Sequence, residues 1–432
     1  MTTRKEIMPF VSLTCLQTDK FKTGFMSINL LTQLDRVTAA KNALLPRVLL
    51  RGTSKRPDIE TLAKYKEDLY GAAVEQTVRK KGEIHCIGLY SDFVDDKFLP
   101  EGEGLIEKIA DLLGELLLSP KTSGGKLLAE YVDGERANLI DDIRGMINEK
   151  RSYSLSQLIK HMCNSEHFAT GRLGSVEEAE KINASNLTRY YRELLETATI
   201  EVFYCGSASV ERIELAMKNA LKTLPRTEPD YNMGTDIRMN SVEEEPRYFT
   251  EELDVSQGKL TLGFRLGETM AAPNYAEIII FNYIYGGSVN SKLFLNVREK
   301  LSLAYYASSI IERHKGIMIV ASGIEFDNYD RAKAEILAQL DAVRESNVGL
   351  DEFTNAKKEA ISDMRAACDS QIKLEDFYLG QAIDGLDYGP DEMSETMDMV
   401  TLEQCVKVAR NVELDAVYFL KAPEIAETGE VV

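Results

Sequence analysis

Alternating apolar and polar residues, interspersed with stretches of helical spacing, organise the first half of the chain. The pattern predicts two strands, two helices, a hairpin, two long helices and a closing strand, in that order. These elements occupy residues 9–17, 24–32, 36–51, 58–70, 72–79 with 83–90, 103–118, 126–148 and 198–205. Because strands are gathered together with runs of helix, the first half does not read as a strict βαβ alternation.

The second half repeats this order of elements. The predicted strands, helices, hairpin, long helices and last strand occupy residues 247–255, 259–266, 275–285, 291–300, 305–312 with 316–324, 328–345, 350–369 and 416–421. Residues 69–82 and 303–316 share a leucine, an arginine, a lysine and a glycine at one offset of 234 residues. The repeated order and these shared residues predict an internal duplication.

A segment without sustained periodicity separates the two halves. Residues 225–246 are rich in proline, asparagine and acidic residues, so we interpret them as a linker. The sequence therefore predicts a first domain over residues 1–224 and a second, homologous domain over residues 247–432. The expected fold class is α+β, in which each domain is a mostly antiparallel sheet covered on one face by helices.

The composition of the chain limits the kinds of partner and the cellular compartment that we expect for it. The chain has 432 residues, which suits two domains, and its net charge of -19 disfavours nucleic acid or an anionic membrane as a partner. No apolar stretch approaches the roughly 20 residues of a membrane span, and no signal peptide is visible. The six cysteines are scattered and form no CxxC, so we expect reduced thiols and a cytoplasmic protein.

Signatures of nucleophilic catalysis and phosphate binding are missing from the sequence, which has no GxSxG, GxxxxGK[ST] or GxGxxG. His85 and His314 fall in or beside a predicted hairpin, where a structural or solvated role is expected rather than metal binding. Cys163 and His167 are four residues apart, a spacing that places two metal ligands on one helical face. An unusual metal site of Cys163 and His167 with Glu135 is therefore an alternative to a helix that ends near residue 164.

Residues 292–308, KLFLNVREKLSLAYYAS, resemble a signature in the second domain of the pitrilysin/insulinase-like metallopeptidases. Residues 50–56, which contain a Gly-Thr, and residues 119–120 and 167–174 resemble further motifs of that family. The resemblance spans nearly the whole chain, including the duplication. It implies the fold described above and, in active members, an inverted zinc motif H-x-x-E-H on the helix before the Gly-Thr.

The resemblance places Ala43, Pro46 and Arg47 where active members have the first histidine, the glutamate and the second histidine. Only the distal glutamate is retained, as Glu135. Alanine and proline bring no ligand, and Arg47 brings a permanent positive charge that could pair with Glu135. Pro46 inside the helix predicts a kink or a restart. We therefore expect no metal, no cofactor, no catalytic residue and no peptide hydrolysis by this chain alone.

Arg298 and Tyr305 match the arginine and tyrosine that face the zinc site from the opposite domain in the family, where they hold substrate and stabilise the oxyanion. The resemblance is to the mitochondrial-processing-peptidase branch, in which a zinc-bearing chain pairs with a zinc-less one. Zinc-less bacterial members are associated with 5-aminopentanol modification of elongation factor P. The resemblance thus implies a peptide-binding subunit of a heterodimer.

Three hypotheses stay open at this point. The chain is either that heterodimeric subunit or a zinc-less scaffold or peptide-binding protein with no peptidase role, including one that assembles as a homodimer. The third hypothesis is an enzyme that uses the Cys163 and His167 site. A near-stoichiometric partner carrying H-x-x-E-H favours the first hypothesis, and zinc in the purified chain favours the third.

Overall fold

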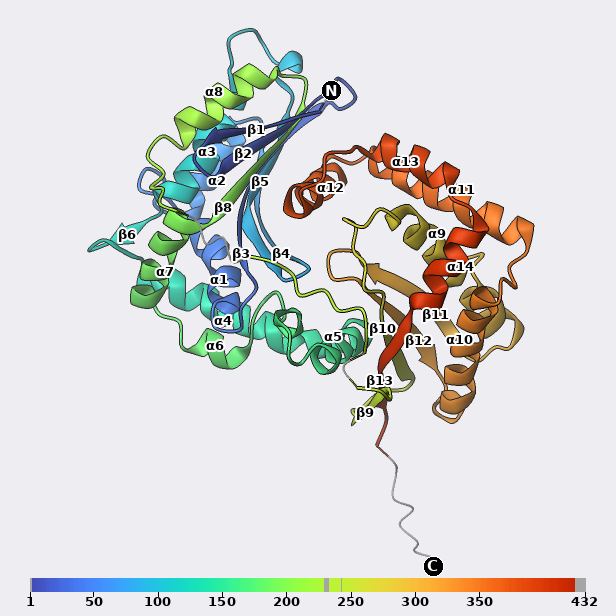
Figure 1. Ribbon diagram of the computed structural model, residues 1–432. Coiled ribbons are helices and arrows are strands. Elements are labelled where there is room, and N and C mark those ends of the chain that lie inside the picture. The colour runs from blue at the N-terminus through green and yellow to red at the C-terminus, as the bar shows by residue number, and fades with distance from the viewer. Residues whose placement is uncertain (1, 229–232, 242, 424–432) are drawn as a thin grey trace, which may run out of the picture. The chain divides into compact units, whose positions relative to one another are not determined.

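The computed structural model describes residues 2–228, 233–241 and 243–423, which form two compact units (Figure 1). Unit 1 comprises the described residues within 1–145, 170–235 and 368–387, and unit 2 those within 146–169, 236–367 and 388–432. The boundary after residue 235 lies inside the predicted linker 225–246, of which residues 229–232 and 242 lie outside the described residues.

Unit 1 is built on a six-stranded sheet with the strand order β1-β2-β8-β3-β5-β4. β2 and β8 run parallel, and the other neighbouring strands run antiparallel. The strands are β1 (Thr2–Met8), β2 (Val11–Gln17), β3 (Thr23–Gln33), β4 (Ala73–Lys81), β5 (Ile84–Val94) and β8 (Thr199–Gly206). A separate small ribbon consists of β6 (Thr122–Ser123) and β7 (Lys126–Leu127).

The helices of unit 1 come from three parts of the chain. They are α1 (Ala39–Leu49), α2 (Ile59–Asp68), η1 (Asp96–Phe98), α3 (Leu105–Leu118), α4 (Ala129–Gly145), α6 (Val176–Glu180), α7 (Ala184–Thr197), α8 (Val210–Ala220) and α12 (Gln371–Asp384). The last of these, drawn in red in Figure 1, belongs to the second half of the sequence but packs on β8 and β3.

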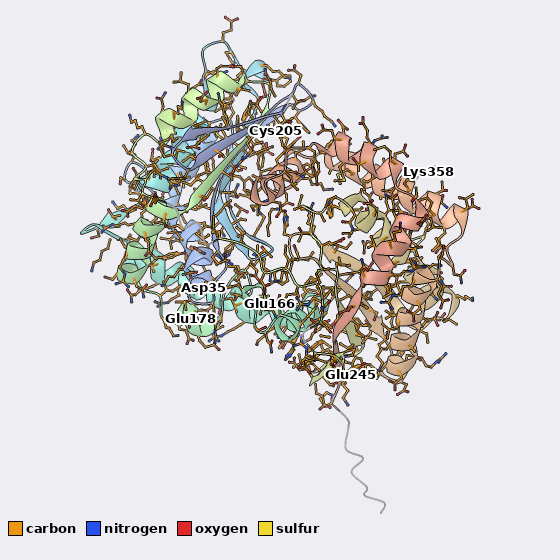
Figure 2. All side chains as sticks on the ribbon, in the orientation of Figure 1. Asp35, Glu166, Glu178, Cys205, Glu245 and Lys358 are labelled. Atoms are coloured by element: carbon orange, nitrogen blue, oxygen red, sulfur yellow. The ribbon has the colours of Figure 1, made fainter. Side chains whose placement is uncertain are left out.

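Alternation along β3 explains how both faces of this sheet are covered. Met26 and Ile28 point into the main core with the helices of the first half. Phe25 points to the opposite face, where it packs with Leu374 of α12 and with Cys205, which is labelled in Figure 2. Since successive side chains of a strand point to opposite faces, one strand serves two layers.

Unit 2 is built on a five-stranded sheet with the order β11-β12-β10-β13-β9. β13 and β9 run parallel, and the other neighbours run antiparallel. The strands are β9 (Arg247–Glu252), β10 (Gly258–Arg265), β11 (Ala304–Glu312), β12 (Ile317–Ile324) and β13 (Glu413–Lys421). Its helices are η2 (Met146–Asn148), α5 (Lys150–Met162), η3 (His167–Ala169), α9 (Tyr275–Tyr285), η4 (Leu293–Lys300), η5 (Phe326–Asn328), α10 (Tyr329–Arg344), α11 (Leu350–Ala367), α13 (Pro390–Met399) and α14 (Leu402–Asn411).

The second sheet is likewise covered on both faces. Leu260 and Leu262 of β10 point into the core with the helices of the second half. On the other face, Leu158 and Met162 of α5, a helix from the first half of the sequence, pack against β10, β12 and β13. A Cβ atom at Gly263 would lie 2.5 Å from the Met162 sulfur, so glycine is what permits α5 to approach this strand so closely.

The predicted α+β class with mostly antiparallel sheets is confirmed. The sequence did not predict that each sheet also carries one helix on its second face, or that this helix comes from the other half of the chain. None of the helices in the described ranges combines the length and the apolar composition that crossing a bilayer requires.

Two lysines at equivalent positions of the duplication form ion pairs with α12 and with the segment that follows α5, the two parts that come from the other half of the chain. Lys81 Nζ, at the end of β4, lies 2.8 Å from Asp376 Oδ1 of α12. Lys315 Nζ, just before β12, lies 2.6 Å from Glu166 Oε2, which follows α5 and is labelled in Figure 2. The shared lysine that indicated the duplication in the sequence is therefore a buried anchor in both units.

A fragment of residues 1–224 is expected to fold poorly by itself, because it lacks α12. Without that helix, Phe25 and Phe203 expose one face of the sheet to water, and such apolar edges and faces promote aggregation. Size-exclusion chromatography and circular dichroism check this. The same fragment with residues 368–387 attached through a flexible linker is the matched control, and equal behaviour of the two fragments would contradict the expectation.

Candidate functional site

The three positions implied for a zinc motif lie on α1, and two of them, Ala43 and Pro46, are buried in the hydrophobic core. Ala43 is completely buried among apolar side chains, which leaves no room there for an imidazole. α1 runs unbroken from Ala39 to Leu49 through Pro46, so the helix does not restart at Pro46, and the other predicted outcome, a kink, stays a prediction. Pro46 stands close to the helix end, and its ring is buried beside an apolar cavity of about 10 Å³ that Leu45 and Leu49 also line. Packing of the ring therefore offsets part of the missing hydrogen bond.

Two ion pairs connect α1 and the residues just after it to α4, where the metal ligands would converge. Arg47 Nη2 lies 2.7 Å from Asp142 Oδ2, and Arg51 Nη1 lies 3.0 Å from Glu135 Oε1. The expectation that Arg47 pairs with Glu135 is therefore wrong, because Asp142, about two turns further along α4, is the carboxylate that faces Arg47. Two guanidinium groups now face the two carboxylates, and their permanent charge opposes a divalent cation at this place.

The alternative site of Cys163, His167 and Glu135 is not assembled. The Cys163 sulfur is buried 3.9 Å from Nη2 of Arg265, which places a positive charge beside it. His167 lies at the surface in η3 of unit 2, and Glu135 belongs to unit 1, where it binds Arg51. Across the ranges that the structure describes, no group of three or more His, Cys, Asp or Glu residues could hold a metal ion.

The histidines of the two hairpins are buried. Nδ1 of His85 lies 3.1 Å from the Asn42 side-chain nitrogen, and burial lowers the pKa of His85 to about 4. His85 is therefore neutral at physiological pH and packs within unit 1. His314 is also buried, at the turn before β12. Of the two roles expected for these residues, structural or solvated, burial favours the structural one.

Purified protein should contain no stoichiometric zinc, and added zinc should not raise its melting temperature. The physical reason is the pair of guanidinium groups of Arg47 and Arg51 in front of the two carboxylates of α4. Metal analysis after dialysis, together with thermal unfolding with and without zinc, measures this. One zinc per chain, lost on Asp142→Asn, would contradict the expectation.

Arg298 and Tyr305 lie on consecutive elements at one edge of the second sheet. Arg298 is part of η4, a π-helix, and its guanidinium carbon lies 4.5 Å from the centre of the Phe294 ring. Its Nη1 is 3.6 Å from Glu299 Oε1. The side chain stays substantially exposed, and π-helices occur frequently at functional sites.

Tyr305 lies at the start of β11, the edge strand, and 58% of its surface is exposed. Its hydroxyl donates a hydrogen bond to the Glu325 carboxylate, and this bond raises the pKa of the Tyr305 phenol. The phenol is therefore neutral at physiological pH. Ser302, with a φ of 49°, turns the chain between η4 and β11. Both side chains thus face solvent from elements that pack on each other.

Known proteins resemble this chain in both sequence and fold. A family model described as "Peptidase M16 inactive domain" matches residues 181–360. The probable inactive metalloprotease YmfF of Bacillus subtilis is 33% identical over 411 residues, which cover 95% of each chain. A conserved protein from Enterococcus faecalis V583 has a similar structure, with a TM-score of 0.90 and 26% identity, over 99% of this chain and 100% of its own.

A peptidase M16 inactive domain from Pseudomonas fluorescens superposes with a TM-score of 0.79 at 14% identity, and covers 98% of both chains. At this identity the likeness concerns the fold alone. Over nearly its full length the chain is therefore similar in sequence to one protein described as a probable inactive metalloprotease, and similar in fold to another described as a peptidase M16 inactive domain.

Proposed function

Since the chain belongs to the M16 peptidase family and is an inactive member of it, we propose that it is the non-catalytic subunit of a heterodimeric zinc peptidase. In this role it binds a peptide substrate and completes the active site of a homologous, zinc-bearing partner. The observation that carries the proposal is the contrast between two regions. The metal positions are closed by Arg47 and Arg51, while Arg298 and Tyr305 stay exposed.

The exposed pair has the chemistry that peptide hydrolysis requires from a second subunit. An arginine donates hydrogen bonds to a carbonyl oxygen and binds more tightly to the negative oxygen of the tetrahedral intermediate. Phe294 lies against the guanidinium and limits its rotamers, so less entropy is lost on binding. Tyr305 is a neutral phenol and a second potential donor, provided that substrate replaces Glu325 as its acceptor.

A pull-down of the tagged chain from its native cytoplasmic lysate tests the proposal. We expect a near-stoichiometric partner of similar length that carries H-x-x-E-H. Peptide hydrolysis by the purified partner is then measured with and without this chain, and the proposal requires activity that depends on both. Full activity of the partner alone would overturn it, as would recovery of this chain with no such partner.

The second candidate function is a scaffold or peptide-binding protein without a peptidase role. The absence of a metal site in the described ranges fits this candidate equally well, but it offers no reason for Arg298 and Tyr305 to be exposed on the consecutive elements η4 and β11. Modification of elongation factor P, which the resemblance implies for zinc-less bacterial members, is the cytoplasmic process in which we would seek the peptide substrate first.

A further inference from the structure

A row of three residues crosses the second sheet at its β11 edge. Tyr306 of β11 is paired with Gly323 of β12, which in turn is paired with Lys259 of β10. The three positions alternate with the core-facing positions of their strands, so they lie on the face that α5 partly covers. Arg151, in the first turn of α5, reaches the same row from above the sheet.

The glycine of the row makes room for the tyrosine. A Cβ atom at Gly323 would lie 2.5 Å from the Tyr306 ring and 2.7 Å from Gln257 Oε1. The ring therefore lies directly over the glycine backbone, an arrangement that a larger residue would displace. Gln257 Oε1 also accepts a hydrogen bond from Lys259 Nζ, which fixes the end of that side chain beside the ring.

Two positive charges meet at this ring. The guanidinium carbon of Arg151 lies 4.4 Å from the ring centre of Tyr306, and Lys259 Nζ lies 5.8 Å from it. An aromatic face attracts cations, which explains how both can gather there. Arg151 Nη2 also donates to Ser308 Oγ at 3.2 Å, so the hydroxyl proton of Ser308 stays available to a further acceptor.

Neither cation forms an ion pair within the part of the chain that the structure describes, although the whole chain has a net charge of -19. Glu149 interacts electrostatically with Lys259, but its carboxylate caps α5 by accepting from the Arg151 backbone N–H at 2.9 Å. Burial lowers the pKa of Lys259; Glu149 opposes this shift, and the charge of Arg151 adds to it. An anion between the two cations would relieve their repulsion.

We infer that the row of Tyr306, Gly323 and Lys259, together with Arg151, is a binding site for a carboxylate of the peptide substrate. The inference rests on the proposed function and specifies the substrate class as a peptide with an acidic side chain or a free C-terminus at this position. Arginine is suited to the planar carboxylate group, and Lys259 and Ser308 add a charge and a hydroxyl donor.

The test uses the full chain and labelled short neutral peptides in four versions. The peptides carry one glutamate or glutamine at the centre and end in a free or amidated C-terminus. Fluorescence anisotropy should show about tenfold tighter binding of one carboxylate version than of its neutral counterpart, the effect of one good charge-assisted hydrogen bond. Which pair differs identifies the source of the carboxylate.

Arg151→Gln and Lys259→Gln should each remove most of this preference, and Gly323→Ala should weaken it without changing any charge. Lys160→Gln removes an equal charge from the exposed side of α5 and should leave the preference intact. Circular dichroism confirms that each variant is folded.

Peptide binding without a carboxylate preference, or a preference that survives Arg151→Gln together with Lys259→Gln, overturns the inference and leaves the proposed function standing. If none of the four peptides binds, either to the chain or to its complex with the zinc-bearing partner, both are rejected.

Discussion

Replacing Glu166 with alanine is expected to destabilise the protein by about 3–5 kcal/mol, the usual effect of removing one partner from a buried charge network. Glu166 Oε1 lies 2.7 Å from Arg265 Nη2, and its other oxygen lies 2.6 Å from Lys315 Nζ. All three side chains are completely buried. The variant removes a buried carboxylate from beside two positive charges in the interior of unit 2, where Arg265 keeps its ion pair with Asp415. A loss of this size is a large fraction of the stability of a typical domain.

Stability should also depend on pH through this group. Burial alone would raise the pKa of Glu166, but the bonds to Arg265 and Lys315 outweigh burial and hold the pKa below its ordinary value. An acid whose pKa is lower in the folded state stabilises the protein above its unfolded-state pKa of about 4.3. That contribution is lost as the pH falls through the lower folded-state pKa.

Urea unfolding followed by circular dichroism measures both effects, since the chain contains no tryptophan to follow by fluorescence. The matched control is Glu403→Ala, which breaks an exposed pair with Lys407 in the same unit and should change the free energy of unfolding by less than about 1 kcal/mol. Equal effects of the two substitutions would show that the buried charge network around Glu166 contributes no more to the free energy of unfolding than an exposed ion pair.

If the proposed function holds, substitution of Arg298 by alanine is expected to lower kcat/KM of the proposed two-chain peptidase by roughly 10²-fold, the lower end of what losing one oxyanion donor costs. The loss should fall mainly on kcat, because the arginine binds the negative oxygen of the intermediate more tightly than the carbonyl oxygen of the substrate. Arg298→Lys keeps the charge but not the planar fork, so an intermediate rate is expected.

The control for this experiment is Arg331→Ala, which removes an exposed arginine from α10 of the same unit. Affinity between the two subunits is measured in parallel, because a lost interface would also lower the rate. Unchanged kinetics for Arg298→Ala, in a complex that still assembles, would show that Arg298 does not contribute to catalysis. That result would favour the scaffold alternative.

Elements with a strong apolar pattern could be predicted from the sequence, and a helix that buries polar side chains could not. α9 has the predicted bounds, and the hairpin strands β11 and β12 agree within one residue. The pattern does not predict α12, because its buried residues include Gln371, Glu375 and Gln381 and are not confined to one stripe. Likewise, a helical period over residues 291–300 cannot distinguish an α-helix from the π-helix η4.

The candidate site shows the same division. The loss of the zinc ligands follows from residue types alone, since alanine, proline and arginine cannot bind zinc. The partner of Arg47 could not be read from the sequence, because Glu135 and Asp142 lie about two turns apart on one helix and only packing decides which of them faces α1. The row at Tyr306 and the Arg151 side chain above it come from four separate segments, so no local pattern indicates this site.

The exchange of α5 and α12 has a consequence for biosynthesis. A chain emerging from the ribosome supplies every strand of the first sheet by residue 206, yet the helix that covers its second face begins at residue 371. At a translation rate of about 5–20 residues per second, this face of the sheet stays uncovered for roughly 8 to 33 s before α12 is synthesised. Nascent chains of this protein should therefore depend on a chaperone during that interval, and faster translation between the two points should increase the yield of folded protein.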